Sequence, residues 1–455
     1  MERKIVKSLA THLLVILALS ATVMFTCLGN ARLWDRDEPR NAGCAAEMMA
    51  RGDLVVPIFN DELRHQKPAL LYWLIISAYK IFGVTEFAAR FWSAVLAIGS
   101  VVSTYFIARR LASPTVGLLA AVILSTSLMF DVAGRAATPD SVLIFCGTLA
   151  MLIYVLGTFS PKQNENAAPS LRSEGHWFPQ NILVVIAMFG VMGLGVLAKG
   201  PVGLIVPTAI IGMFLLLKRL KPRAPEIVAT NGRFGNLLIN CFRPFQPAHF
   251  FATCWYMRPI TAIVTVLVVA APWYIAVGLR TDGDFLQMFF LTEHFGRATT
   301  TFENHSGGFW YYPVAIILGF FPWSAFFLPI AISTDRRISR NDNWSTIYIF
   351  CLCWIAVQVG IFSVAQTKLP SYVTPCYPAL AILASCCLYQ IATQSSLVPA
   401  FFIKAAFGAL SLSGIGITVG LIIALNKFFP DTMWLAVIGI IPLVGGAVCF
   451  WQFSR

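Results

Sequence analysis

Long apolar runs separated by short polar stretches dominate this chain. The runs are roughly 16–25 residues long, which is the length that an α-helix needs to cross the hydrocarbon core of a bilayer. They predict an all-α polytopic membrane protein with about twelve transmembrane helices. We place these helices at 9–28, 87–108, 115–131, 141–158, 181–198, 202–217, 259–279, 311–333, 344–363, 374–393, 401–425 and 433–452.

The composition agrees with that pattern and excludes an ordinary soluble enzyme. Of the 455 residues 58% are hydrophobic and 12% are charged, and the mean hydropathy is +0.74. A soluble domain carries about 25% charged residues. Most of the eleven cysteines fall inside apolar runs, where cysteine behaves as a small hydrophobe, so they indicate neither a disulfide framework nor a zinc site.

Basic residues sort by loop and predict the orientation. They cluster before the first span, after the span at 87–108, in the loop 218–258 and at 336–340. By the positive-inside rule these segments and both termini are cytoplasmic, and the net charge of +12 reflects orientation and lipid contact more than nucleic-acid binding. The first span could be a signal peptide, but its apolar run is long and Thr26-Cys27-Leu28-Gly29 is a poor cleavage site. We therefore expect a multi-pass protein of the inner (plasma) membrane.

One apolar stretch does not fit the count. Residues 69–84 are too few for a comfortable span and include Lys80. Counting them as a span would place every later basic loop outside, so we expect a juxtamembrane helix at the outer interface. The extracytoplasmic loops are then 29–68, 134–140, 199–201, 280–310 and 366–372.

These outer loops contain an unusual density of ionisable residues. Asp37, Glu38 and Arg40 follow the first span at the depth of a lipid headgroup, and His65 and Lys67 precede the interfacial helix. The plain alternative is a solvated loop whose charges serve solubility. Other outer turns repeat the pattern, although a lysine at a span end can also be a snorkelling anchor. These turns contribute Arg135, Asp140, Lys199 and Lys368.

Cations and carboxylates on one side of a membrane suit transfer of a sugar from a lipid phosphate. Lysine and arginine stabilise the departing phosphate, and arginine can do so with two parallel hydrogen bonds. A carboxylate orients or deprotonates the attacking group at the anomeric carbon. A transporter is the alternative of another class, but it would place ionisable groups near the middle of the membrane and often shows inverted repeats. We find no internal repeat.

Several motifs in order resemble a known family. They are Trp34-Asp35-Arg36-Asp37-Glu38-Pro39-Arg40, Gly52-Asp53-Leu54-Val55-Val56-Pro57, Lys67-Pro68-Ala69-Leu70-Leu71-Tyr72-Trp73-Leu74, Phe87-Ala88-Ala89-Arg90, Arg135-Ala136-Ala137-Thr138-Pro139-Asp140, Ala198-Lys199-Gly200-Pro201 and Lys368-Leu369-Pro370-Ser371-Tyr372. Over about residues 9–390 the chain resembles the GT-C membrane glycosyltransferases. Within them it is most similar to the lipid A aminoarabinose (4-amino-4-deoxy-L-arabinose) transferases and their relatives, the protein O-mannosyltransferases.

The resemblance implies roles for individual residues. Asp37 resembles the catalytic carboxylate, with Glu38 adjacent and Asp140 as a second acidic residue facing the acceptor. Arg40 and Lys67 match positions that hold the donor phosphate, and we group other outer cations with them. These further phosphate-binding candidates are Arg135, Lys199 and Lys368, and possible acceptor or lipid contacts are His65, Tyr72 and Tyr372.

The implied enzyme is an inverting glycosyltransferase that uses a polyprenyl (undecaprenyl) phosphate donor without a cofactor or metal. Glu293, His294, Glu303 and His305 could form a metal site, but their spacing is no recognised ligand pattern. We expect lipid A or a related glycolipid as acceptor, with transfer to protein Ser/Thr as the alternative; the sugar stays open. The protein is expected to be a monomer without nucleic-acid partners.

The resemblance also implies a division of the chain. Residues 1–393 would form the GT-C catalytic domain, with the motif-bearing outer loop at 29–86, and residues 394–455 would add C-terminal transmembrane helices. Two departures from the family are visible. Ala69 stands where a second proline is common, and we expect no soluble domain after the last span.

Overall fold

The fold is almost wholly helical. The computed structural model describes residues 2–34, 36–160, 176–220, 242–296, 307–342, 344–428 and 430–454. Within these ranges the only strands are β1 (Ile58–Phe59) and β2 (Glu62–Leu63), a short antiparallel pair in which Ile58 lies opposite Leu63. The expected all-α class is confirmed.

Nine helices in the described ranges are long and apolar enough to cross a membrane. Two of them join a 3₁₀ segment to an α-helix, namely η4 (Pro370–Cys376) with α19 (Tyr377–Ala392) and η5 (Pro430–Gly439) with α21 (Ile440–Ser454). The other seven are α1 (Glu2–Phe25), α4 (Glu86–Leu111), α7 (Pro139–Thr158), α8 (Ile182–Lys199), α13 (Pro259–Arg280), α18 (Ser345–Val364) and α20 (Ala400–Phe428).

The remaining expected spans are bent or short. α5 (Pro114–Ser125) and α6 (Leu128–Arg135) meet at 67°, and α16 (Tyr311–Gly319) meets η3 (Trp323–Phe326) with α17 (Phe327–Arg340) at 114°. If each pair is one span the described part has up to 11, and α9 (Val202–Lys218), with 17 residues, sits at the lower limit of spanning length. Every expected span therefore corresponds to a helix or a bent pair. The sequence did not predict the bends, because the average hydropathy of a window carries no information about the direction of the helix axis.

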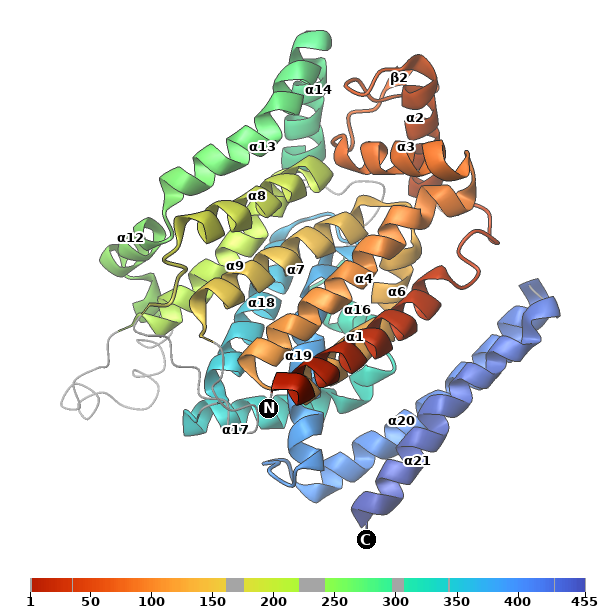
Figure 1. Ribbon diagram of the computed structural model, residues 1–455, viewed down its shortest axis with the longest axis vertical. Coiled ribbons are helices and arrows are strands. Elements are labelled where there is room, and N and C mark those ends of the chain that lie inside the picture. Colours follow the sequence, from red (N-terminus) through yellow and green to blue (C-terminus); the bar gives the residue numbers. More distant parts are fainter. Residues whose placement is uncertain are drawn as a thin grey trace.

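Two short helices follow α1 at one end of the bundle. α2 (Asp37–Arg51) begins with two carboxylates, which favour a helix N-terminus, and ends at Gly52 in the left-handed conformation, with φ of 67°. α3 (Leu70–Phe82) corresponds to the apolar stretch 69–84 and packs against α2 and α4, and its place at the outer interface stays a prediction. Figure 1 shows α2, α3 and β2 at the same end of the molecule as α14 (Asp284–Gln287), far from α17, which carries Arg336 and Arg337.

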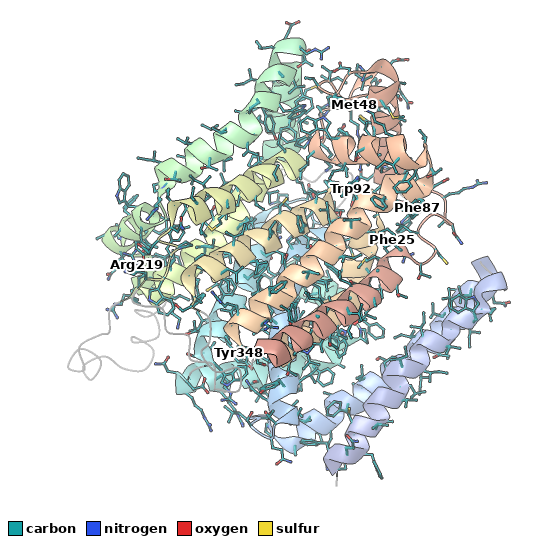
Figure 2. The ribbon with its side chains drawn as sticks, in the orientation of Figure 1. Phe25, Met48, Phe87, Trp92, Arg219 and Tyr348 are labelled. Carbon is teal, nitrogen blue, oxygen red and sulfur yellow. The ribbon has the colours of Figure 1, made fainter. Side chains whose placement is uncertain are left out.

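Aromatic packing fixes the point where the chain leaves α1 for this end. Phe25, the last residue of α1, lies with its ring centroid 6.3 Å from that of Phe87 at the start of α4, and Figure 2 shows the two side by side. Phe82 at the end of α3 stands edge-on to Phe87, at 5.4 Å. Because these rings hold three helix ends together, the start of α2 is placed close above the bundle.

The remaining elements complete the described chain. They are η1 (Arg243–Phe245), α12 (Pro247–Tyr256) and η2 (Met288–Gly296), a π-helix. α20 and α21 form a close pair in which a Cβ on Gly414 would lie 2.4 Å from the backbone nitrogen of Leu443. This pair meets the bundle through η3 and α17, with Phe326 and Phe407 at 5.4 Å, and Figure 1 shows it extending beside the bundle. The division at 393–394 stays a prediction.

Candidate active site

An ion pair joins two neighbouring helix ends below α2. Lys199, the last residue of α8, donates a hydrogen bond through Nζ to Oδ1 of Asp140 in the first turn of α7. Each side chain is 15% exposed. Both positions suit their charges, because a carboxylate is stabilised at a helix N-terminus and a cation at a C-terminus. The structure thus joins a predicted acceptor-facing carboxylate to a predicted phosphate-binding lysine.

Two further predicted residues reach the same lysine. Asp37, the half-buried first residue of α2, lies close enough to Lys199 to interact with it electrostatically. The ring of Tyr372, in η4, has its centroid 5.0 Å from the Lys199 ammonium. Four elements that are far apart in the sequence therefore contribute to one cluster, which we call the lysine cluster: Asp37, Asp140, Lys199 and Tyr372.

Tyrosines connect Lys368 to this cluster. Lys368 is buried at 7% exposure, donates to the carbonyl of Ser363 at 3.0 Å, and lies 5.8 Å from the ring centroid of Tyr312. Tyr311 and Tyr312 stand at the start of α16, which packs against η4, the segment that carries Tyr372. Sequence reasoning missed these two tyrosines because they open an apolar run, where aromatic residues are ordinary interfacial anchors.

Glu38 is held on every side. Its carboxylate accepts hydrogen bonds from Arg90 (2.7 and 2.9 Å), from the backbone N–H of Ala137 (2.7 Å) and from that of Trp34 (3.0 Å). Burial alone would raise the pKa of Glu38, but the bonds from Arg90, Ala137 and Trp34 outweigh burial and lower that pKa below its ordinary value. The residue is therefore a paired anion at neutral pH with its oxygens committed to protein donors.

Arg135 and Tyr72 lie outside the lysine cluster. The Arg135 guanidinium donates to the carbonyls of Val23 and, at 2.6 Å, Thr26, so it satisfies carbonyls at the end of α1. Tyr72 has 0% exposure beneath α2, and its hydroxyl accepts a hydrogen bond from Arg64 at 3.0 Å. Its side chain is enclosed by protein in this structure, and its expected acceptor or lipid contact stays a prediction.

The other predicted residues line the first loop. Arg40 is exposed on α2, one turn after Asp37, and Lys67 is half-buried in the turn between β2 and α3. His65 Nε2 lies 3.6 Å from Oε1 of Glu293, which ties this loop to η2. Asp35, Glu303, His305 and the side chain of His294 lie outside the described residues. Within the described ranges no group of three or more His, Cys, Asp or Glu side chains is placed to hold a metal ion.

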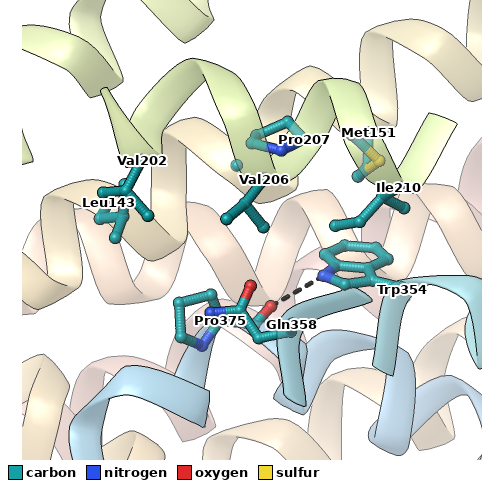
Figure 3. Close-up of a pocket in the computed structure, with 10 residues that line it drawn as sticks. Leu143, Met151, Val202, Val206, Pro207, Ile210, Trp354, Gln358 and Pro375 are labelled. Atoms are coloured by element: carbon teal, nitrogen blue, oxygen red, sulfur yellow. Dashed lines mark hydrogen bonds between the residues drawn. The ribbon is translucent and has the colours of Figure 1, made fainter. Parts of the chain in front are cut away.

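An apolar groove begins one helical turn below the Asp140–Lys199 pair. Leu143 and Val202 line its near end, and Gly147, Met151 and Val206 continue along α7 and α9, as Figure 3 shows for the labelled side chains. Ile210, Pro207, Pro375, Trp354 and Gln358 complete the lining.

The far wall of the groove is fixed by hydrogen bonds to η4. Trp354 Nε1 donates to the carbonyl of Pro375 at 2.9 Å (Figure 3), and Gln358 Nε2 donates to that of Tyr372 at 2.6 Å. The second bond links the groove directly to the lysine cluster. Polar groups at one end and an apolar channel leading away from them suit a ligand with a charged head and a greasy tail.

The sequence matches a protein family over most of the bundle. Residues 13–277 match the family described as dolichyl-phosphate-mannose-protein mannosyltransferase. The chain belongs to this family. This match confirms the expected resemblance. The apolar helices confirm the prediction of a multi-pass membrane protein.

Curated relatives are similar at the level of sequence. An undecaprenyl phosphate-alpha-4-amino-4-deoxy-L-arabinose arabinosyl transferase of Erwinia tasmaniensis is 30% identical over 83% of this chain and 60% of its own length. One of Aeromonas salmonicida, with the same name, is 31% identical over 77% of this chain and 55% of its own length. The chain thus spans between half and two thirds of these relatives.

Solved structures confirm the fold. ArnT from Cupriavidus metallidurans bound to undecaprenyl phosphate has a TM-score of 0.70, with 22% identity, and covers 97% of this chain and 72% of its own. The archaeal oligosaccharyltransferase AglB from Archaeoglobus fulgidus has a TM-score of 0.51, with 14% identity over 95% of this chain and 56% of its own. At such identities the likeness establishes a shared GT-C fold and nothing about substrates.

Proposed function

We propose that this family member is an inverting glycosyltransferase that moves a sugar from undecaprenyl phosphate to a phosphate of lipid A or a related glycolipid. The observation that carries the proposal is the lysine cluster at the mouth of an apolar groove. The names of the relatives, which specify undecaprenyl phosphate and aminoarabinose, support the same donor and make 4-amino-4-deoxy-L-arabinose the first sugar to test.

The cations would stabilise the departing lipid phosphate. Negative charge grows on this phosphate as the sugar leaves, and prearranged ammonium groups in a partly dry site favour that charge. Lys199 lies at the centre of the cluster. Lys368 is a second cation near the site, and its ammonium lies over the ring of Tyr312. Arg40 and Lys67, in the loop above, are retained as phosphate ligands. For Arg135 we propose a bracing role instead, because its guanidinium already serves the end of α1.

Asp37 and Asp140 would organise the acceptor. In an inverting transfer the acceptor attacks the anomeric carbon directly, so the enzyme needs a positioned nucleophile and no covalent intermediate. A lipid phosphate is already ionised, and Asp37 then orients the attacking group without removing a proton. Asp140 holds Lys199 in place. Glu38 acts as a brace, since its oxygens are committed to Arg90 and two backbone N–H groups.

The groove would hold the first part of the prenyl tail. It leads from the Asp140–Lys199 pair along α7 and α9 into the apolar body of the bundle. A donor phosphate beside Lys199 would place the tail at Leu143 and Val202. Side chains along the groove would have to move apart to admit the first isoprene unit, and the rest of the prenyl chain would lie in lipid.

The site would face the extracytoplasmic side of the inner membrane, with both termini cytoplasmic. α17, with its cluster of arginines, lies at the end of the molecule opposite α2 and α3 (Figure 1). The positive-inside rule assigns the arginine-rich end to the cytoplasm, so the lysine cluster lies near the outer surface. An enzyme there would meet lipid acceptors of the outer leaflet.

Reconstituted transfer is the direct test. The purified protein is placed in vesicles with undecaprenyl phosphate-aminoarabinose and lipid A, and the lipids are analysed by mass spectrometry. We expect a mass increment of one amino-pentose on lipid A that forms much more slowly with Asp140→Asn. Transport of a solute into the vesicles without any glycosyl transfer would overturn the enzyme assignment.

Transfer to protein is the second candidate, and the family match favours it. Analysis of exported proteins from cells with and without the gene separates the two. Hexose on Ser/Thr that depends on the gene, with unchanged lipid A, would replace the lipid acceptor by a protein hydroxyl.

A further inference from the structure

Ala137, between α6 and α7, is held by side chains of α2 that form hydrogen bonds with both its N–H and its carbonyl. The N–H of Ala137 donates to Glu38 Oε1 at 2.7 Å, and its carbonyl accepts from Asn41 Nδ2 at 3.0 Å. Glu38 and Asn41 are three residues apart on α2, so they share one face of the helix. Ala137 is itself 0% exposed. The helix that begins with Asp37 therefore holds the turn that leads to Asp140.

We call this arrangement the clamp: the side chains of Glu38 and Asn41 are its two arms, and Ala137 is held between them. An arginine supports each arm. Behind Glu38 stands Arg90, which also donates to the carbonyls of Leu28 and Ala31, at 3.0 and 2.8 Å. Arg64 stands behind Asn41 and donates through Nη2 to Asn41 Oδ1 at 2.9 Å. Arg64 is only 6% exposed, and its Nε donates to the Tyr72 hydroxyl at 3.0 Å. The second arm thus gives a structural role to a buried arginine, a buried asparagine and a buried tyrosine.

The chemistry of the second arm specifies asparagine. Arg64 can only donate, so the side chain at position 41 must present oxygen to it. The Ala137 carbonyl can only accept, so the same side chain must present N–H on its other side. An aspartate would keep the pairing with Arg64 but would set a carboxylate oxygen against the carbonyl of Ala137.

The route from the clamp to the site is short and stiff. Only Thr138 and Pro139 separate Ala137 from Asp140, and the proline fixes its own φ at the first turn of α7. At the other end Asp37 directly precedes Glu38. We propose that Asn41 and Arg64 are positioning residues that, with the Glu38 arm, fix the distance between Asp37 and Asp140 for the sugar transfer. The inference rests on the proposed function only for its link to catalysis.

Amide hydrogen exchange tests the clamp without any activity. The full-length protein is compared with Asn41→Asp and with Asn60→Asp, which makes the same chemical change at an exposed position of the same loop. We expect Asn41→Asp to speed exchange in residues 136–140 and Asn60→Asp to leave it unchanged. Equal protection of 136–140 in all three proteins would overturn the clamp.

A double-mutant cycle tests the link to catalysis. A misplacement of about 1 Å can cost on the order of 10²-fold in rate, so Asn41→Asp should lower kcat on that order with the donor KM nearly unchanged. In the Asp140→Asn background the same change should have little further effect, because the group it positions is already lost. Effects that multiply, or a loss explained by less folded protein, would contradict a positioning role.

The two experiments separate the two proposals. If the wild-type protein transfers no sugar but Asn41→Asp still speeds amide exchange at 136–140, the proposed function is wrong and the clamp is supported. Normal kcat per folded molecule in an Asn41→Asp protein that exchanges faster at 136–140 would keep the function and remove the positioning role.

Discussion

Arg90 holds Glu38 by two hydrogen bonds, from Nη2 to Oε2 at 2.7 Å and from Nε to Oε1 at 2.9 Å. The pair joins α4 to the first turn of α2, and both side chains are at least 95% buried. A parallel two-point contact of this kind is both strong and directional. It therefore sets the angle at which α2 leaves the bundle, and with it the position of Asp37.

Glu38→Gln should destabilise the protein most at neutral pH. Breaking a buried pair by removing one charge costs about 3–5 kcal/mol, because the other charge stays buried. The folded pKa of Glu38 is lower than its ordinary value of 4.5, so its contribution is complete above that pH and is lost as the pH falls through the folded pKa. Thermal unfolding in detergent between pH 7 and pH 3 should show a wild-type curve that drops toward a flatter Glu38→Gln curve.

Glu62→Gln supplies the control for this experiment. Glu62 is an exposed carboxylate in β2, and its loss should leave the wild-type pH dependence in place. Parallel curves for wild type and Glu38→Gln would show that the ion pair does not form.

Lys199→Met should be worse for stability than the loss of both partners. The single change leaves Asp140 mostly buried without its cation, at a cost of about 3–5 kcal/mol in the free energy of unfolding. Lys199→Met with Asp140→Asn removes both charges and should recover most of that loss. Both variants should be inactive in sugar transfer. The double variant should therefore recover stability without recovering activity. Lys80→Met, at an exposed lysine of α3, should change neither.

Asp37→Asn should report the class of acceptor. A general base contributes about 10²–10⁴-fold to a rate, so a hydroxyl acceptor would lose activity on that scale. For the proposed phosphate acceptor no proton is removed, and we expect a smaller loss in kcat with reconstituted lipid A. A loss of about 10²–10⁴-fold would count against the lipid phosphate and in favour of Ser/Thr.

The sequence was sufficient to predict the helices, and most of the predicted site residues lie at one end of the bundle. Spans are readable because each needs a minimum apolar length, and the expected helix at 69–84 appears as α3. The Asp140–Lys199 pair was not predictable, since its members are 59 residues apart and meet only because α7 packs against α8.

The sequence also could not separate paired charges from available ones. Glu38 and Asp37 are neighbours in one motif, yet one is enclosed by Arg90 and the other reaches Lys199. Arg90 itself sits inside an apolar pattern, where nothing local indicates a partner 52 residues earlier. Burial and partners, which decide whether a side chain can meet a substrate, are properties of the packing.

Filling the groove should discriminate donors by the length of their tails. Gly147 lines the groove, and a Cβ there would meet nothing within 4 Å, so the side chain of Gly147→Leu would enter the groove. We expect a higher KM for undecaprenyl phosphate-aminoarabinose and a smaller change for a donor with a tail too short to reach Gly147. Gly416→Leu is the matched control, because Gly416 on α20 is equally open but lies outside the groove. If Gly147→Leu raised KM equally for both donors, the tail would have to lie elsewhere, and the groove would be a packing defect between α7 and α9.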